Sequence, residues 1–343
     1  MNPKLSSMLL LVFLGVAADA LAETLPVNIA LVTVGDPGNV ADPLTGYGNV
    51  PYTYSIGEFD VTLGQYAAFL NSVATASDPY GLYTPAMATD MPTCGILQTS
   101  SSSGYSYALK GNKNGNMPVF DVTWGDAARF VNWLANGEPT SGTEGTGTTE
   151  TGTYALNGGT SNAALMAVTR SSTANWVLPN VNEWYKAAYY SGGGTNSVYW
   201  LYPTRSNNPP SNLLSATGTN NANFSGFGTA GPSDPVNYLT LVGAFAGSPG
   251  PYGTYDQGGD VWQWEETAVN GLYRAQEGAS FADVFGSLAS SGYNDPTPSG
   301  SSDGVGFRVA YVPEPSAIVM LIAAAVTIST FAKLRPYVKE GRQ

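Results

Sequence analysis

The sequence predicts an α+β fold with little regular secondary structure. Three short segments combine helix-start signals with an apolar face, and the strand-like segments are few and brief. The stretches between them are long and rich in Gly, Ser, Thr and Asn, which favour turns. We therefore expect clusters of aromatic side chains to hold the chain together.

The composition excludes several classes of function. The 343 residues include 13 Lys and Arg against 25 Asp and Glu, so the formal net charge is −12, and nucleic-acid binding needs a basic patch. The chain has no histidine, which excludes Ser-His-Asp and Cys-His catalysis and every His-ligated metal centre. Cys94 is its only cysteine, so no intramolecular disulfide can form, and we expect a small buried apolar side chain there.

The N-terminus is typical of a secretory signal peptide, which we assign to residues 1–22. Lys4 provides the positive start, Met8 to Ala18 form the apolar run, and Ala20-Leu-Ala22 is an A-x-A cleavage site. The mature chain would then begin at Glu23. The low fraction of charged residues, 11%, agrees with an exported protein.

Two strands are expected before the first helix. Leu25 to Val34 is rich in Val, Ile and Leu, and a turn over Gly35 to Gly38 follows it. In Tyr52 to Phe59, aromatic and aliphatic residues alternate with small ones, which predicts a half-buried strand.

Three short amphipathic helices are predicted from the capping-box spacing, in which the N-cap residue and the residue three positions later bond each other's backbone. The pairs are Thr62 with Gln65, Thr123 with Asp126, and Asn180 with Glu183. The apolar faces that follow are Tyr66, Phe69, Leu70 and Val73; Ala127, Phe130, Val131 and Leu134; and Trp184, Ala187 and Ala188. The run Gly192 to Gly194 is expected to end the third helix.

Between these helices the chain is polar. Gly137 to Gly152 consists mainly of Gly, Thr and Glu with almost no apolar residue, which predicts a mobile surface excursion. Ser206 to Gly231 is also rich in turn-forming residues. Loops of this length are usually functional or disordered.

The densest stretch is Gly253 to Glu266, with two tryptophans, adjacent glycines and four acids. Trp262 and Trp264 share one face of an extended segment, and Gly258-Gly259 permits a turn with positive φ just before them. One interpretation is a core strand entered through a tight turn, with solvated acids. The alternative is a calcium loop, because carboxylates and turn carbonyls are hard oxygen donors.

The C-terminus is expected to form a separate module, residues 312–343. Its Pro-Glu-Pro would break a preceding strand, and Ala317 to Ala332 is an uncharged, largely apolar stretch. As a transmembrane helix, residues 317–332 would span about 24 Å, slightly less than the roughly 30 Å of a hydrocarbon core. A basic tail follows, with Lys333, Arg335, Lys339 and Arg342. By the positive-inside rule, this tail would stay cytoplasmic and the preceding domain would face outward.

This C-terminal module resembles a PEP-CTERM sorting signal, through Pro313-Glu-Pro315, the apolar span and Arg335. In that family an exosortase cleaves near the Pro-Glu-Pro. The resemblance implies a Gram-negative-type envelope, a transient membrane anchor and final display at the cell surface or in an extracellular matrix.

The body of the chain resembles the formylglycine-generating enzyme family, also called sulfatase-modifying factor domains. Six landmarks occur in the family's order within residues 28–311, and we assign the domain to residues 23–311. They are Phe59 to Tyr66, Met117 to Ala127, Val177 to Trp184 (with Val177 in place of an arginine), Tyr255 to Trp264, Gly278 to Phe281, and Gly306 to Ala310. The resemblance implies an α+β fold of low regular content, related to C-type lectin-like folds.

The resemblance also implies structural calcium. One family site carries over to the side chain of Asp256, the backbone carbonyls of Gly259 and Val261, and Gln263, where the family has Glu. Because an amide oxygen carries no charge, we expect such a site to be weak. A second family site would begin at Asn223, but its downstream acid is not recognisable.

Active members of the resembled family bind copper through two cysteine thiolates between the last two landmarks. Ser280 to Gly306 contains no cysteine, and oxygen ligands do not replace thiolates for Cu(I), so we expect no copper and no catalytic residue. The first hypothesis is a non-catalytic domain that binds a glycan or a peptide. The alternatives are a formylglycine-generating oxidase acting on sulfatases and a structural envelope protein.

Overall fold

The computed structural model describes residues 27–112, 115–225, 232–236 and 238–312. The predicted signal peptide, residues 1–22, lies outside these residues, as do the predicted membrane helix 317–332 and its basic tail. Within the described part of the chain, no helix is both long and apolar enough to cross a membrane.

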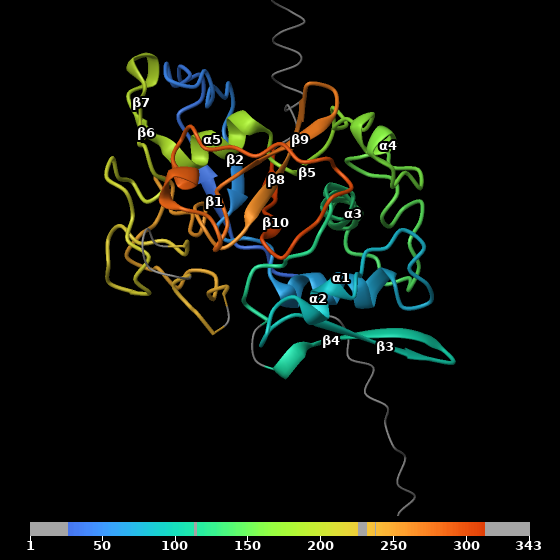
Figure 1. Ribbon diagram of the computed structural model, residues 1–343. Coiled ribbons are helices and arrows are strands. Elements are labelled where there is room, and N and C mark those ends of the chain that lie inside the picture. The colour runs from blue at the N-terminus through green and yellow to red at the C-terminus, as the bar shows by residue number, and fades with distance from the viewer. Residues whose placement is uncertain (1–26, 113–114, 226–231, 237, 313–343) are drawn as a thin grey trace, which may run out of the picture.

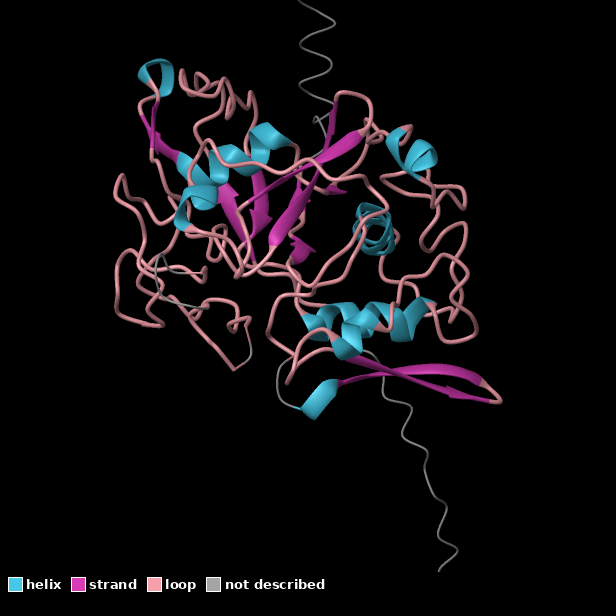
Figure 2. Cartoon of the chain, viewed as in Figure 1, coloured by secondary structure: helices cyan, strands magenta, loops and turns pink. Residues whose placement is uncertain are grey.

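Short helices and strands alternate with long loops, as Figure 2 shows. The α-helices are α1 (Leu63–Val73), α2 (Ala86–Thr89), α3 (Trp124–Ala135), α4 (Asn162–Met166) and α5 (Val181–Tyr189). Single 3-10 turns cover Lys110–Asn112, Gly194–Asn196 and Phe285–Leu288. An α+β fold of low regular content is confirmed for the described residues.

The strands form two small sheets and two hairpins in the described residues. One sheet has the order β1 (Leu31–Val34), β2 (Tyr54–Gly57), β11 (Ala310–Tyr311), β5 (Trp176–Val177). The other has the order β10 (Val305–Phe307), β8 (Trp262–Val269), β9 (Tyr273–Glu277), with β10 and β8 parallel. The hairpins are β3 (Ile96–Ser101) with β4 (Gly104–Leu109) and β6 (Tyr190–Gly192) with β7 (Val198–Tyr199). In Figure 1 the β3–β4 hairpin lies along α1 and α2, at the opposite end of the molecule from α5.

The three predicted capping boxes are present. Thr62 Oγ1 accepts a hydrogen bond from Gln65 N at 3.2 Å, and Gln65 Oε1 accepts one from Thr62 N at 2.8 Å. The same reciprocal pairs occur at the starts of α3 and α5, so these helices begin where the spacing places them. Every residue of the predicted apolar faces is buried, which confirms the three helices.

Aromatic rings join α1, α3 and β10 in the main core. Tyr66 and Phe69 of α1 lie 6.2 and 5.3 Å from Phe130 of α3, measured between ring centroids. Phe307 of β10 meets Phe130 edge-on at 5.3 Å, and Trp133 packs on Phe69 at 5.3 Å. Such pairs contribute about 0.5–1.5 kcal/mol each beyond their burial. This is the kind of cluster that the sequence leads us to expect.

The glycine run after α5 does not end that helix. α5 ends at Tyr189, because Tyr190 adopts extended backbone and pairs with Tyr199 as the start of the β6–β7 hairpin. Gly192 to Gly194 have φ of 114°, 102° and 56°. These left-handed conformations let the chain reverse between the two short strands.

The tract Gly137 to Gly152 is not the purely exposed excursion that its composition predicts. Thr149 and Glu150 are buried, and Glu150 Oε1 accepts a 2.7 Å hydrogen bond from Arg129 Nε of α3. Asn132, also on α3, donates to the Thr149 carbonyl at 2.7 Å. The guanidinium of Arg129 and the amide of Asn132, both on α3, hold this tract in place. The composition of the tract alone does not reveal these partners.

Candidate functional site

The stretch Gly253 to Glu266 forms a turn followed by β8, as the sequence predicts. Its left-handed backbone is not confined to glycine: φ is 91° at Gly259, but also 57° at Asp256 and 56° at Asp260. A Cβ on Gly259 would collide with the carbonyl of Asn223. Only glycine therefore fits at that point of the turn.

The two tryptophans of β8 are both anchored by their indole N–H groups. Trp264 is buried, and its Nε1 donates to the Val122 carbonyl at 2.9 Å. Trp262 is half-buried, and its Nε1 donates to Asp283 Oδ2 at 2.9 Å. A large ring with a satisfied polar atom is a strong anchor for a core strand.

The expectation of solvated acids in this stretch is wrong. Asp260 and Glu265 expose only 1% and 0% of their surface. Asp260 Oδ1 accepts hydrogen bonds from Asn223 Nδ2 and Thr240 N at 2.8 and 2.7 Å, and Thr240 Oγ1 donates to Oδ2 at 2.8 Å. Burial raises the pKa of Asp260 to about 7, although these hydrogen bonds oppose the shift.

Gln263, one of the four predicted calcium ligands, uses its side chain to connect other protein groups. Its Oε1 accepts hydrogen bonds from Trp184 Nε1 at 2.7 Å and from Arg308 Nε at 2.8 Å. Its Nε2 donates to the carbonyl of Asp256 at 2.8 Å. Both lone pairs of the amide oxygen are therefore in use.

Two of the other three predicted ligands, Asp256 and Gly259, also accept hydrogen bonds. Asp256 Oδ2 accepts a hydrogen bond from Gly243 N at 2.6 Å, and the carbonyl of Gly259 accepts one from Val261 N at 2.8 Å. Oxygens of Asp256, Gly259 and Gln263 thus already accept hydrogen bonds from protein donors. Calcium at this place stays a prediction, and it requires the hydrogen bond between Gln263 and Arg308 to open.

Arg308 is fully buried and uses every N–H of its guanidinium. It donates to the side chains of Gln263 and Asp60 and to the carbonyls of Gly57, Glu58 and Tyr255. Burial lowers the pKa of Arg308, and the charge of Asp60 opposes that shift. The Arg308 side chain therefore connects the C-terminal strands to the end of β2, to the segment between β2 and α1, and to the turn before β8.

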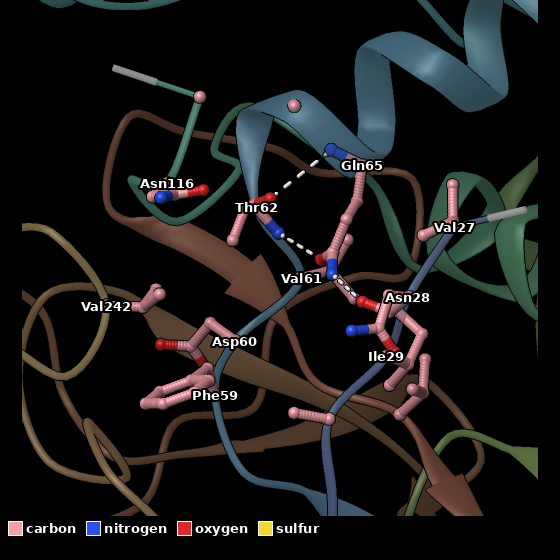
Figure 3. A pocket seen from close by; sticks show the side chains of 14 residues that line it. Val27, Asn28, Ile29, Phe59, Asp60, Val61, Thr62, Gln65, Asn116 and Val242 are labelled. Carbon is pink, nitrogen blue, oxygen red and sulfur yellow. Dashed lines mark hydrogen bonds between the residues drawn. The ribbon is translucent and has the colours of Figure 1, made fainter. Parts of the chain in front are cut away.

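A cavity of about 460 Å³ adjoins this cluster (Figure 3). The segment from Val27 to Ile29 lies on one side of it, and Asn116 and Val242 lie on the other. Asp60 lines the cavity; it is buried, and its Oδ2 accepts no hydrogen bond. Burial raises the pKa of Asp60 well above its usual range, although Arg308 opposes the shift.

The window from Ser280 to Gly306, where active members of the resembled family carry their cysteines, presents oxygen instead of sulfur. Asp283 Oδ2 accepts hydrogen bonds from Ser280 N, Ser280 Oγ and Trp262 Nε1 at 2.9, 2.5 and 2.9 Å. This carboxylate fixes the turn after β9. The single cysteine, Cys94, is buried in the main core, where burial raises its pKa to about 11 and keeps it a thiol.

A second cavity, of about 360 Å³, lies against β8 and β9. Glu277 lines it, and Glu265 lies on the neighbouring strand. Burial raises the pKa of both carboxyl groups well above the usual range.

Sequence reasoning missed four members of these sites. A signal existed for Arg308, which is a single charge within the apolar run of β10 and β11, and for Glu265, which directly follows Trp264. No comparable signal marks Asp60 or Glu277, because each becomes significant only through partners far away in the sequence.

Comparison with known proteins gives several structural likenesses and one family match. None of the curated proteins matches the sequence. Similar solved structures are CarF (20% identity, TM-score 0.47), Treponema denticola variable protein 1 (17%, 0.47) and PvdO from Pseudomonas aeruginosa (14%, 0.42). They cover 83%, 84% and 82% of this chain, and 99%, 96% and 94% of their own. Likenesses at this level carry no argument about function. Residues 46–312 match the family described as "Sulfatase-modifying factor enzyme 1-like domain", and because that match covers most of the chain, the protein belongs to this family.

Proposed function

We propose that this protein is a non-catalytic member of its family, which acts by binding a glycan or an extended peptide. The observation that carries the proposal is the lack of soft metal ligands: the chain has one cysteine and no histidine. The window from Ser280 to Gly306 contains neither residue type, and the carboxylate of Asp283 is occupied by protein donors. Copper-dependent oxidation requires thiolates that this window does not offer.

The cavity beside Arg308 supports binding of a polar, uncharged ligand. Its lining combines the amides of Asn28 and Asn116 with the ring of Phe59. Amides bond sugar hydroxyls and peptide groups, and an aromatic ring packs against the apolar face of either. A volume of about 460 Å³ falls in the usual range for small-ligand sites, about 300–1,000 Å³.

The location that we propose is the cell surface or the extracellular matrix of a Gram-negative-type bacterium. The support comes from the sequences of residues 1–22 and 312–343, which resemble a signal peptide and a PEP-CTERM sorting signal. An exosortase-type enzyme is the processing partner that the second signal implies. Before processing, the C-terminal helix would hold the protein in the membrane.

Two alternatives make different predictions. A formylglycine-generating oxidase would oxidise a cysteine-containing sulfatase peptide in the presence of copper. A structural envelope protein would bind neither sugars nor peptides with a defined preference, and the abundance of Gly, Ser and Thr would suit it.

The test combines an array of glycans and peptides with an oxidation assay on the same purified protein. We expect selective binding on the array and no turnover of a cysteine-containing sulfatase peptide with added copper. Turnover would overturn the proposal in favour of the oxidase. An array without any selective ligand would overturn it in favour of the structural protein.

A further inference from the structure

A cavity of about 340 Å³ is lined by β6 and by three loop segments. Tyr190, Trp200 and Tyr252 contribute aromatic side chains to it, and Asp36 and Arg205 contribute one negative and one positive charge. It shares no lining residue with the cavity of Figure 3, which lies at the start of α1. The two cavities are therefore separate sites.

The two charged side chains of this cavity are carried on strained backbone. φ is 55° at Asp36 and 56° at Arg205, in the left-handed region that residues other than glycine rarely adopt. Asp enters this region more readily than most residues, but Arg does not. Strained residues persist only where the surrounding structure holds them, and they gather at binding sites. The backbone at Arg205 therefore marks its side chain as a candidate binding group.

Both charged groups keep hydrogen-bonding capacity that the described part of the protein does not use. Arg205 is exposed, and its guanidinium forms no ion pair and no hydrogen bond with any described residue. Asp36 Oδ2 accepts a hydrogen bond from the Tyr190 hydroxyl, whereas Oδ1 accepts none from the described residues. The Asp36 carbonyl accepts one from Lys186 Nζ at 2.8 Å, which fixes this loop. A ligand would therefore meet a fork of free donors and one positioned acceptor.

The aromatic side chains of the cavity are held in place by the protein. Tyr190 and Tyr252 stack with ring centroids 6.4 Å apart and planes 11° from parallel. The Tyr190 hydroxyl accepts a hydrogen bond from Gly194 N at 2.8 Å. The backbone N of Trp200 donates to the Tyr189 carbonyl at 2.8 Å. Trp200 and Tyr252 are half-buried, so part of each side chain stays accessible to a ligand.

These groups together match a neutral pyranose sugar. Such a ring has an apolar face of C–H groups that packs against an aromatic side chain, and its hydroxyls both donate and accept hydrogen bonds. Two adjacent hydroxyl oxygens can accept from the planar fork of the Arg205 guanidinium, and a third hydroxyl can donate to Asp36 Oδ1. The volume of about 340 Å³ lies within the usual range for small-ligand sites, about 300–1,000 Å³.

The lining disfavours other classes of ligand. A metal ion would find one carboxylate, that of Asp36, and would be repelled by Arg205. An anion would be attracted by Arg205 but repelled by Asp36 and by the net charge of −12. The lining contains no Val, Ile, Leu or Met, so it offers no aliphatic pocket for an apolar peptide side chain.

We propose that this cavity binds a neutral pyranose unit of a glycan, with the sugar ring against Trp200 and Tyr252 and its hydroxyls on Arg205 and Asp36. The inference goes beyond the proposed function, because it assigns a second site with a ligand class of its own. A sugar site here is compatible with an oxidase as well as with a binding domain, so the two proposals can fail separately.

The test is saturation-transfer NMR on the purified full chain with the methyl pyranosides of glucose, galactose and mannose, followed by titration. Sorbitol, a linear polyol without a rigid ring, is the matched probe. We expect at least one pyranoside to bind with a dissociation constant of about 1 mM, the value that the usual efficiency of small ligands gives for its size. Sorbitol should bind at least about tenfold more weakly, because its flexible chain must be ordered and has no flat C–H face.

Three outcomes with these probes would overturn the inference. The first is that no pyranoside binds. The second is equal affinity for sorbitol and the pyranosides, which would mean that no sugar ring is recognised. The third is tighter binding of methyl glucuronoside than of methyl glucoside, which would assign the cavity to an acidic ligand.

Two variants of the cavity and one control locate the binding. Arg205→Gly removes the guanidinium, and glycine adopts left-handed backbone without strain, so the fold should be kept while the sugar affinity falls about tenfold or more. Trp200→Ala removes the ring and should weaken binding about threefold or more. Asn157→Gly makes the same change as the first variant at an exposed residue outside the cavity, where φ is 49°, and should leave the affinity unchanged.

The inference and the proposed function fail in different ways. Sugar binding that neither cavity variant weakens would place the ligand elsewhere on the protein and overturn the inference alone. If Trp200→Ala does not fold, Arg205→Gly decides the matter by itself. Copper-dependent turnover of a sulfatase peptide by a protein that still binds the pyranoside would overturn the proposed function alone.

Discussion

Buried glutamates occur in two regions of this molecule with opposite surroundings. Beside α3, Glu150 accepts hydrogen bonds from Arg129 Nε at 2.7 Å and from Gly158 N at 2.6 Å. On the β8–β9 face, Glu265 accepts none at either side-chain oxygen, and Glu277 accepts none at Oε2. Both regions remove carboxyl groups from water, but only the first supplies a counter-charge. Burial of an acid therefore does not by itself show whether its charge is compensated in this fold.

The largest effect should come from breaking the compensated pair. Glu150→Gln leaves the guanidinium of Arg129 buried without its counter-charge, and we expect the free energy of unfolding to fall by about 3–5 kcal/mol. Chemical denaturation followed by tryptophan fluorescence measures this. The double variant Arg129→Met/Glu150→Gln is the control and should recover part of the loss. A decrease in the free energy of unfolding of less than about 1 kcal/mol would show that the ion pair between Arg129 and Glu150 contributes little to stability, as exposed ion pairs do.

The opposite sign is expected on the β8–β9 face. Glu265→Met replaces an unpaired buried acid by an apolar side chain of similar length, so the unliganded protein should gain about 1–3 kcal/mol of stability. A loss of stability by the same amount would show that Glu265 has a structural partner, and the contrast with Glu150 would disappear.

The effect of Asp121 on the free energy of unfolding should lie between those of Glu150 and of calcium, and it should depend on pH. It is buried, one of its oxygens has no partner, and burial raises its pKa to about 7. Below about pH 4 the carboxyl group of Asp121 is protonated in both the folded and the unfolded protein. Between about pH 4 and pH 7 the unfolded chain has released this proton and the folded protein still holds it, so the free energy of unfolding falls as the pH rises. Above pH 7 the contribution of Asp121 is constant.

Asp121→Asn should remove that part of the pH dependence and raise stability at pH 8 by about 1 kcal/mol. Asparagine also tolerates the left-handed backbone at this residue, where φ is 57°. Thermal unfolding of both proteins at intervals from pH 4 to pH 8 makes the comparison. Parallel curves for the two proteins would contradict the raised pKa.

The smallest effect should be that of calcium on the predicted ligands Asp256, Gly259, Val261 and Gln263. Because the Gln263 oxygen already accepts two hydrogen bonds, an ion would have to displace a donor. We expect 1 mM calcium to raise the melting temperature by about 1 °C or less, as for a ligand near its dissociation constant. A rise of several degrees that a chelator reverses would show a tight site and a rearranged Gln263.

Local signals in the sequence predicted local structure well. The three capping boxes are contained within four residues each, so the starts of α1, α3 and α5 could be predicted. The burial of Glu150 could not, because its partner Arg129 lies 21 residues away in a different element. The same holds for the candidate site, because Gln263 meets Arg308 across 45 residues.

β11, which is late in the sequence, lies inside its sheet, so the sheet cannot be complete before this strand is in place. Ala310 pairs with Ile56 of β2 on one side and with Val177 of β5 on the other, and β5 has no other strand beside it in the sheet. A chain that enters a translocation channel N-terminus first delivers this strand last. On the export route proposed above, the sheet would therefore stay incomplete until β11 has passed the channel, and the chain would remain unfolded while it is threaded through.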